Sequence, residues 1–347
     1  MGLFPINSAH RDGHWLALVL SLATNAATAA PTATELLQRG DAAGAASRFA
    51  EQARDGRPVA QNNLGVLYQR GQGVPRDYAQ ARAWFEKAAA QGLPGAMYNM
   101  GMLYLRGYGV PVDATRAAAW LEKAAALEEP EAQFYLGLLH YRGEGVPKDL
   151  AVAAYWFEKA AAAGVTEARY NLALMLARGE GVPVDETRAL ALLEPFATTR
   201  DDAALLVAEI HLRHVEEPAR AAQALAVFRR LAESGVADAQ SALAMMYVMG
   251  TGTPVDVQEG RFWMEQAARQ GIPSAQLNLA GFYAQGIGAE RDLSEAHAWY
   301  TLSAENGETG ARAFADAVAN ELDTDGLLRA ATRLGELRAL TGAGGGR

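Results

Sequence analysis

The chain has 347 residues, a net charge of −9 and no cysteine; 50% of its residues are hydrophobic and 20% are charged. An acidic balance argues against a surface that binds the phosphates of nucleic acid. The absence of cysteine excludes a disulfide framework, a thiolate metal site and a cysteine nucleophile.

The first thirty residues have the layout of an export signal. His10, Arg11 and His14 precede a short apolar run at 15–23, and small residues follow up to the A-x-A sequence at 27–29. This order is typical of a signal peptide, and the run is too short to cross a membrane as a stable helix. We therefore expect a Sec-type signal peptide and a periplasmic or secreted bacterial protein. An uncleaved anchor or a disordered leader is the alternative.

From Ala60 onward, one pattern returns at a nearly fixed interval. Its seven copies begin at Ala60, Ala96, Ala132, Ala168, Ala204, Ala239 and Ala275. With the first Ala as position 0, apolar or small residues at positions 0, 4, 5, 7 and 8 predict a helix with one buried stripe. The motif Gly-x-Gly-Val-Pro follows and is interpreted as a helix terminator. A fixed period of this kind predicts an array of one helical unit.

A second helix is predicted in each unit. An Asp stands two residues after the Pro and would cap it: Asp77, Asp113, Asp149, Asp185, Asp256 and Asp292. Gln80, Glu259 and Glu295 come three residues later, which predicts a capping box in three copies. All the Trp residues outside the leader share one position of this helix, which favours packing between helices: Trp84, Trp120, Trp156, Trp263 and Trp299.

The pattern A-x-x-x-L-G-x-x-Y-x-x-G-x-G-V-P-x-D-x-x-x-A-x-x-W-F-x-K-A-A-x-x-G resembles the Sel1-like repeat, a relative of the tetratricopeptide repeat, from about Ala60 to Gly310. The resemblance implies an all-α, right-handed α/α superhelix (solenoid) of about seven 36-residue helix-turn-helix repeats with terminal caps. It also implies a scaffold or adaptor, often in a bacterial envelope, whose concave surface holds other proteins.

The domain organisation follows from the array. We expect a signal peptide at 1–30, an N-terminal capping partial repeat at 31–59, repeats 1–4 at 60–203, a degenerate repeat 5 at 204–238, repeats 6–7 at 239–310, C-terminal capping helices at 311–340 and a disordered tail at 341–347. Pro195 falls inside a predicted second helix, and Val215-Glu216-Glu217-Pro218 replaces the glycine loop. Because Pro interrupts helices, a kink or hinge is predicted here.

The search for reactive groups predicts no catalytic residue, no cofactor and no metal site. His211 and His214 have Glu209, Glu216 and Glu217 nearby and could in principle hold a metal, but such pairs are more often surface residues. The glycine loops lack the Lys-Ser/Thr of a phosphate loop. No nucleophile, base and orienting group stand apart from the repeat pattern.

Positions 2, 6, 9 and 10 of the first helix face away from its predicted core stripe. By resemblance they would line the concave groove, so an apolar stripe there predicts a protein-binding surface. The candidate partner-binding residues are Tyr98, Met102, Phe134, Leu138, Tyr170 and Leu174, beside an arginine ladder of Arg70, Arg106, Arg142 and Arg178. Such a groove would take a protein or peptide with an acidic and hydrophobic segment.

Three alternatives stay open at this point. Curvature of the superhelix could bury the stripe against neighbouring units, and each Arg could instead neutralise the end of its own helix. Position 3 holds Asn63, Asn99, Asn171 and Asn278, which could bind an adjacent loop or a partner backbone, with the loop favoured. For function, we expect an exported, non-enzymatic scaffold; a periplasmic regulator of an envelope sensor and an envelope hydrolase are the alternatives.

Overall fold

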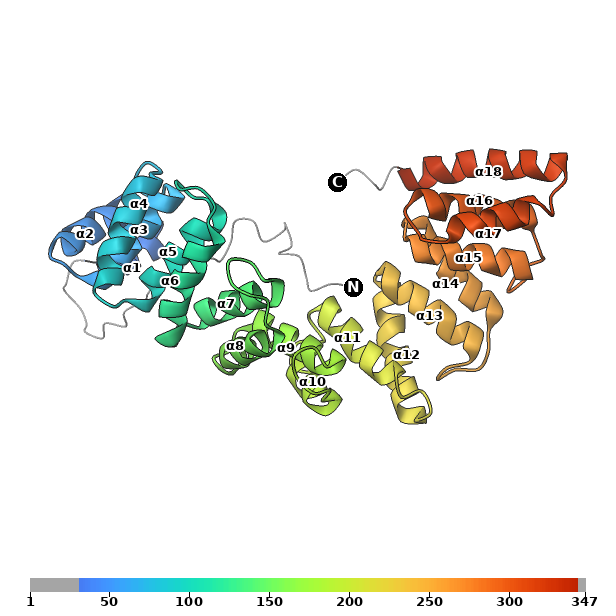
Figure 1. The fold of residues 1–347 in the computed structure, drawn as a ribbon, viewed down its shortest axis with the longest axis horizontal. Coiled ribbons are helices and arrows are strands. Elements are labelled where there is room, and N and C mark those ends of the chain that lie inside the picture. The colour runs from blue at the N-terminus through green and yellow to red at the C-terminus, as the bar shows by residue number, and fades with distance from the viewer. Residues whose placement is uncertain (1–30, 343–347) are drawn as a thin grey trace. The chain divides into compact units, whose positions relative to one another are not determined.

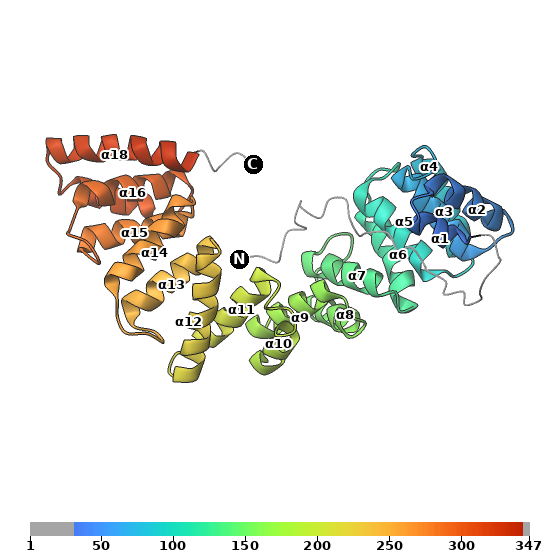
Figure 2. The ribbon, with the colours of Figure 1, turned by 180° about the vertical axis from the view of Figure 1, so that it is seen from behind.

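The structure, a computed structural model, describes residues 31–342 as eighteen α-helices, with no strand in this range (Figures 1 and 2). The predicted signal peptide and all but the first two residues of the predicted tail lie outside the described residues; Thr341 and Gly342 end the last helix. The chain divides between Leu192 and Leu193 into two compact units, which are described separately.

Both units are stacks of antiparallel helix pairs. Unit 1 contains α1 (Ala33–Gln38), α2 (Ala42–Arg54), α3 (Pro58–Arg70), α4 (Tyr78–Ala90), α5 (Pro94–Arg106), α6 (Ala114–Ala126), α7 (Pro130–Arg142), α8 (Leu150–Ala162), α9 (Thr166–Arg178) and α10 (Glu186–Leu193), which ends at the division. Unit 2 contains α11 (Asp201–Leu212), α12 (Pro218–Glu233), α13 (Ala237–Met249), α14 (Val257–Arg269), α15 (Pro273–Gln285), α16 (Leu293–Glu305), α17 (Ala311–Ala319) and α18 (Thr324–Gly342). The predicted all-helical repeat fold is thereby confirmed.

The two glycines of each loop have different physical roles. The first, such as Gly250 after α13, takes φ near +71° and caps the helix through its N–H, which donates to the carbonyl of Met246. The second, Gly252, has φ +69°, and a Cβ there would lie 2.6 Å from the carbonyl oxygen of Ala221, at the start of the preceding second helix. The sequence analysis treated both as terminators, but the second glycine also permits close approach between successive repeats.

The Asp caps are confirmed, but the predicted capping boxes at Gln80, Glu259 and Glu295 are wrong. Asp256 accepts the backbone N–H groups of Gln258 and Glu259, while its own N–H donates to the carbonyl of Tyr247 and so closes the loop. The Glu259 carboxylate instead accepts from the indole N–H of Trp263 at 3.0 Å, as Glu295 does from Trp299. The N–H of Asp77 likewise donates to Tyr68, so no cap N–H remains for Gln80 to bind.

The core of a repeat forms where the second helix crosses a glycine of the first. In repeat 1, a Cβ at Gly65 would lie 2.6 Å from the ring of Phe85, which is completely buried. Gly101 with Leu121 and Gly137 with Phe157 repeat this contact. The Trp residue before each of these core residues is half-buried, and Trp84 and Trp120 pack beside the core clusters as predicted. In unit 2, Trp263 is half-buried beside its cluster and Trp299 is almost fully buried within it.

A polar clamp joins successive repeats and was not foreseen. At position 1, the amide N–H₂ of Gln61, Gln133, Gln240 or Gln276 donates to a carbonyl at the end of the preceding second helix, at 3.1 to 3.3 Å. The Gln276 oxygen also accepts from Asn306 on the following helix at 2.9 Å. Each of these carbonyls also accepts a backbone N–H from the turn that follows its helix, so the buried amide adds a second hydrogen bond there and fixes the spacing between successive repeats.

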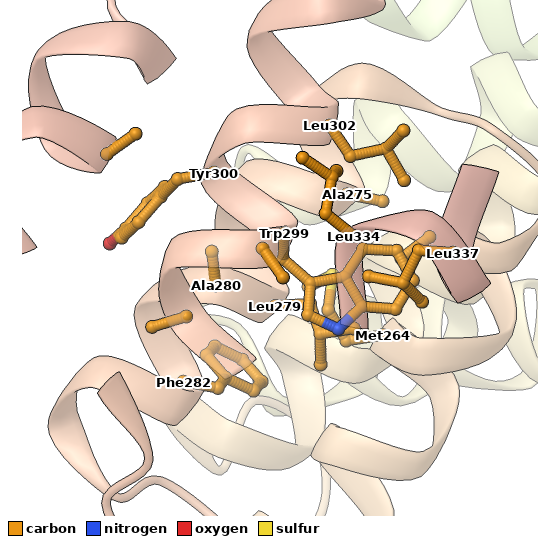
Figure 3. Close-up of a cluster of buried hydrophobic side chains, with 14 of the residues drawn as sticks. Met264, Ala275, Leu279, Ala280, Phe282, Trp299, Tyr300, Leu302, Leu334 and Leu337 are labelled. Carbon is orange, nitrogen blue, oxygen red and sulfur yellow. The ribbon is translucent and has the colours of Figure 1, made fainter. Parts of the chain in front are cut away.

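Helices at both ends cover the array. At the N-terminus, α1 and α2 meet through Gly40-Asp41, and Phe49 is buried against α3 residues. At the C-terminus, α17 and α18 pack on α16, where Leu334 and Leu337 join the cluster around Trp299 (Figure 3). Ion pairs between Arg333 and Glu295 at 2.9 Å, and between Arg338 and Glu305, tie α18 to repeat 7.

The degenerate region departs from the repeat at both of the predicted places. The second helix of repeat 4, α10, has 8 residues instead of 13 and ends before Pro195. The loop from α11 to α12 has no glycine, and Glu217 caps α12 without a side-chain hydrogen bond. A kink or hinge at this segment stays a prediction.

Candidate partner-binding surface

The predicted apolar stripe of unit 1 is buried. Its six residues, Tyr98, Met102, Phe134, Leu138, Tyr170 and Leu174, expose between 1% and 8% of their surface. The expectation that these side chains line an open groove is therefore wrong, and the alternative of burial against neighbouring units holds. Aromatic packing is the physical reason: the rings of Tyr98 and Tyr135 lie 6.0 Å apart across successive repeats, and within repeat 3 the rings of Phe134 and Phe157 lie 5.9 Å apart.

The asparagines at position 3 of repeats 1 and 2 help to close this face. The side-chain amide of Asn99 on α5 donates to the side-chain oxygen of Asn62 on α3 at 2.8 Å, and both residues are fully buried. Asn62 in turn donates to Asn63 at 3.4 Å. The favoured expectation of a bond to an adjacent loop is thus wrong for Asn99, which contacts the neighbouring first helix instead. In unit 2, Asn278 is exposed.

An acidic pair at the start of α7 has unusual electrostatics. Burial raises the pKa of Glu129 to about 7, and a hydrogen bond and the charge of Glu131 act in the same direction. Burial, followed by the charges of Tyr135 and these two carboxyls, raises the pKa of Tyr98 well above its usual value. Arg106 hydrogen-bonds to Tyr135 and opposes the rise that burial causes in the Tyr135 pKa. This acidic cluster of Glu129, Glu131, Tyr98, Tyr135 and Arg106 therefore links α5 with α7.

The arginine ladder occupies helix ends. Arg70, Arg106, Arg142 and Arg178 are the last residues of α3, α5, α7 and α9. Their places fit the alternative in which each charge complements its own helix dipole. Arg142 pairs with Glu144 at 3.7 Å and Arg178 with Glu180 at 3.8 Å, both in the loops that follow.

A row of half-buried side chains accompanies these arginines. Leu105 and Tyr141 precede Arg106 and Arg142 and are half-buried, in contrast to the apolar stripe, which is buried. The Tyr141 hydroxyl donates to Glu180 of the next repeat at 2.6 Å, and burial together with this bond raises the Tyr141 pKa to about 12. Unit 1 therefore presents an aromatic and basic rim, defined as Leu105, Arg106, Tyr141, Arg142 and Arg178.

The corresponding face of unit 2 is more open in repeats 6 and 7, whereas Leu206 and Ile210 of repeat 5 are buried. Ser241 and Met245 on α13 and Leu277 and Gly281 on α15 hold the same positions 2 and 6, and all four are half-buried. Met249, in place of the ladder arginine, exposes 69% of its surface. The sequence favours the unit 1 stripe, which is aromatic and aliphatic in successive repeats, whereas Ser241 and Gly281 interrupt the apolar pattern of repeats 6 and 7.

One group of potential metal ligands comes together at the degenerate loop. Ligand atoms of His214, Glu216 and Glu217 lie within 4.8 Å of one another, and His214 Nδ1 is 3.5 Å from Glu216. Glu217 is paired with Arg220 at 3.1 Å, and both carboxylates are exposed. A metal would have to displace this arginine and desolvate exposed carboxylates, so the group does not define a site.

No helix among residues 31–342 combines the length and apolar character that a bilayer-spanning segment needs.

Comparisons with known proteins agree with the repeat geometry. A family model described as the Sel1 repeat matches residues 58–93, 94–128, 130–165, 166–198, 237–272 and 273–308. The chain matches none of the curated proteins at a significant level. Among solved structures it is similar to a protective antigen of uropathogenic Escherichia coli with an SLR fold, with 25% identity, 88% of this chain and 75% of that chain covered, and a TM-score of 0.57. A Sel1 repeat protein from Oxalobacter formigenes shows 26% identity, coverage of 78% and 94%, and a TM-score of 0.45.

Proposed function

Because the chain belongs to the Sel1 repeat family, a family of protein-interaction scaffolds, we propose that it is a non-enzymatic scaffold that binds another protein through its repeats. The aromatic and basic rim of unit 1 is the proposed contact surface. The observation that carries this proposal is the regular succession of Arg106, Arg142 and Arg178 at helix ends, with Leu105 and Tyr141 half-buried beside them.

The partner chemistry follows from how these arginines are held. The ion pairs of Arg142 and Arg178 join side chains that remain between 26% and 49% exposed, at 3.7 and 3.8 Å. Exposed pairs of this kind contribute little to stability, about 0 to 1 kcal/mol. A carboxylate on a partner can therefore replace Glu144 at small cost, while Glu180 also holds the Tyr141 hydroxyl. An apolar side chain of the partner would rest on Leu105 or Tyr141. The proposed partner carries an acidic and hydrophobic segment, and the buried stripe supports the rim from beneath.

Export to the periplasm or beyond is part of the proposal. It is supported by the basic, apolar and A-x-A order of residues 10–29. N-terminal sequencing of protein recovered from a secreting bacterium tests it. We expect a mature start near Ala30, and an intact Met1 in the cytosolic fraction would contradict export.

The acidic pair of α7 bears on the alternative of an envelope hydrolase. Two carboxyls with separated pKa values are a feature of glycoside hydrolases, but those enzymes hold them about 5 to 9.5 Å apart to admit a sugar or a water. Glu129 and Glu131 instead share a hydrogen bond. The pair therefore lacks the gap that this chemistry requires, and the scaffold remains the better supported function.

The rim is tested by capturing partners from an envelope extract with the full chain. The double variant Arg106→Ala/Arg142→Ala should lose the captured protein, and purified components should then show about tenfold weaker binding with a flatter dependence on salt. Arg48→Ala on α2, which removes an exposed pair with Glu51 outside the rim, is the matched control. Equal binding by both variants would show that the rim is not the contact surface.

A further inference from the structure

Repeat 7 lacks a side chain at a position that is apolar in every other repeat. Position 6 carries Val66, Met102, Leu138, Leu174, Ile210 and Met245, whereas repeat 7 has Gly281. A Cβ built at Gly281 would meet only the hydroxyl oxygen of Tyr300 within 4 Å, at 3.6 Å. At Gly101, by contrast, a Cβ would lie 2.8 Å from Leu121. The space above Gly281 is therefore not filled by the neighbouring helices.

The hollow arises from a shift of the glycine by one position. In repeats 1 to 3 the glycine stands at position 5, and Phe85, Leu121 or Phe157 packs over it. In repeat 7 that position is Ala280, which is completely buried, and the equivalent second-helix residue is Tyr300. Tyr300 is buried in the same cluster, but its ring points away from Trp299 (Figure 3), and its hydroxyl oxygen would lie 3.6 Å from a Cβ at Gly281.

Apolar side chains surround this hollow. Leu277 and Ala284 lie one turn before and one turn after Gly281 on the same face of α15, and both are half-buried. Met245, which holds the same position in repeat 6, belongs with Leu277 to the set packed against the unit 2 core. On the other side, Phe314 of α17 stacks on Tyr300 with ring centroids 5.4 Å apart and exposes 54% of its surface.

The first helices beside the hollow carry almost no charge, which sets them apart from the rim of unit 1, and on α17 Arg312 and Asp316 pair with each other at 3.3 Å. Helix α15 contains no charged residue, and α13 contains only Asp238. Met249 and Gln285 occupy the positions of the ladder arginines. An acidic ligand would lose hydration here without gaining a countercharge, so charge complementarity favours an uncharged segment.

We propose that the hollow over Gly281 receives one branched aliphatic side chain, such as Leu, from an uncharged segment of a partner protein. The side chain contacts Leu277, Ala284 and Met245, and the Tyr300 hydroxyl is placed to hydrogen-bond to the backbone of the segment. An open position flanked by apolar side chains fits an anchoring residue of a peptide, as found at the centres of protein interfaces. This inference rests on the proposed scaffold function and adds a second contact surface of different chemistry.

The probe is a set of nine-residue peptides of Ser and Gly with blocked ends and a central Leu, Ala or Glu. Binding to the full chain is followed by NMR from the methyl signals of Met245 and Leu277 and the ring signals of Phe314. We expect saturable shifts with the Leu peptide, at least tenfold weaker binding of the Ala and Glu peptides, and no loss of Leu-peptide affinity in 0.5 M salt, since the contact is apolar.

Two substitutions fill the hollow to different extents. Gly281→Leu should abolish the shifts, and Gly281→Ala, which the open space accommodates without a clash, should weaken binding about threefold while leaving the fold intact. Absence of saturable shifts with the Leu peptide, equal affinity in the Gly281 variants, or tighter binding of the Glu peptide would overturn the proposal.

Arg106→Ala/Arg142→Ala distinguishes this inference from the function on which it rests. That variant should keep Leu-peptide binding while losing the partner captured by the rim. Gly281→Leu should lose Leu-peptide binding while keeping the partner captured by the rim.

Discussion

Positions 2 and 6 of the first helices form the same face in both units, because both units are built from copies of one repeat pattern. The two units differ in how far neighbouring helices bury this face. In unit 1, the ring of Tyr98 reaches Tyr135 of the next repeat, and both are buried. In repeats 6 and 7 of unit 2, Met245 and Leu277 at positions 6 and 2 stay half-exposed, although the similar side chains of Met102 and Leu174 are buried in unit 1. The comparison teaches that the side chains supplied by neighbouring helices, and not the size of the residue alone, decide whether this face is core or surface.

The largest effect on stability should come from truncating a side chain in the buried stripe of unit 1. Tyr98→Ala removes a ring that is 1% exposed, and we expect a loss of about 4 kcal/mol in the free energy of unfolding. Leu277→Ala, at the same repeat position in unit 2, should cost about 1 kcal/mol because its side chain is already half-exposed.

Chemical denaturation followed by circular dichroism measures both losses. Trp120→Ala serves as a reference for a packing residue of unit 1. Equal losses in the free energy of unfolding for Tyr98→Ala and Leu277→Ala would show that the two faces are buried to the same extent, contrary to the comparison.

A smaller change in stability, of opposite sign in the two units, is expected when Gly101 or Gly281 is replaced by Ala. Gly101→Ala places a Cβ 2.8 Å from Leu121 and should destabilise the protein by about 2 kcal/mol through overpacking. Gly281→Ala meets open space and should stabilise it by about 0.5 to 1 kcal/mol, because Ala is the better helix residue. Thermal unfolding of the pair gives the measurement, and a destabilised Gly281→Ala would show that the hollow is filled.

The smallest expected effect is a pH dependence of stability, which comes from Glu129 in unit 1. Glu129 has a folded-state pKa of about 7 against an ordinary value of 4.5, so between these values the folded chain binds more protons than the unfolded chain. Its contribution to stability therefore declines as pH rises from about 4.5 to about 7 and is fully unfavourable above that. Glu129→Gln should remove this decline and stabilise the protein at pH 8 by about 1 kcal/mol, a figure reduced for partial solvation of the carboxyl.

Unfolding curves at pH 5 and pH 8 measure the difference. Glu122→Gln, at an exposed site on α6, controls for the loss of one negative charge. If Glu129→Gln and Glu122→Gln change the pH dependence equally, the acidic pair of α7 is not strained by burial.

The repeat, its helix pairs and its caps could be predicted from the sequence because their causes are local. The 36-residue period gave the unit, Gly and Pro placed the helix ends, and Asp77 and its equivalents capped the second helix. Pro195 likewise marked the short α10, since a proline beyond the first turn interrupts a helix. Each of these inferences needed only residues within a few positions of one another.

The candidate surface could not be predicted in the same way, because exposure depends on what the next repeat supplies. The helical period placed Tyr98 opposite the core stripe of its own helix, but the neighbouring repeat covers that side with Tyr135. Glu259 satisfied the spacing of a capping box, yet Trp263 competes for its carboxylate and Tyr247 takes the cap N–H. The second loop glycine and the Gln clamp also depend on contacts with backbone carbonyls of the preceding repeat. The sequence by itself therefore determined the unit and its local ends, and the tertiary structure decided which faces stay open, because burial is set by contacts between repeats 30 or more residues apart.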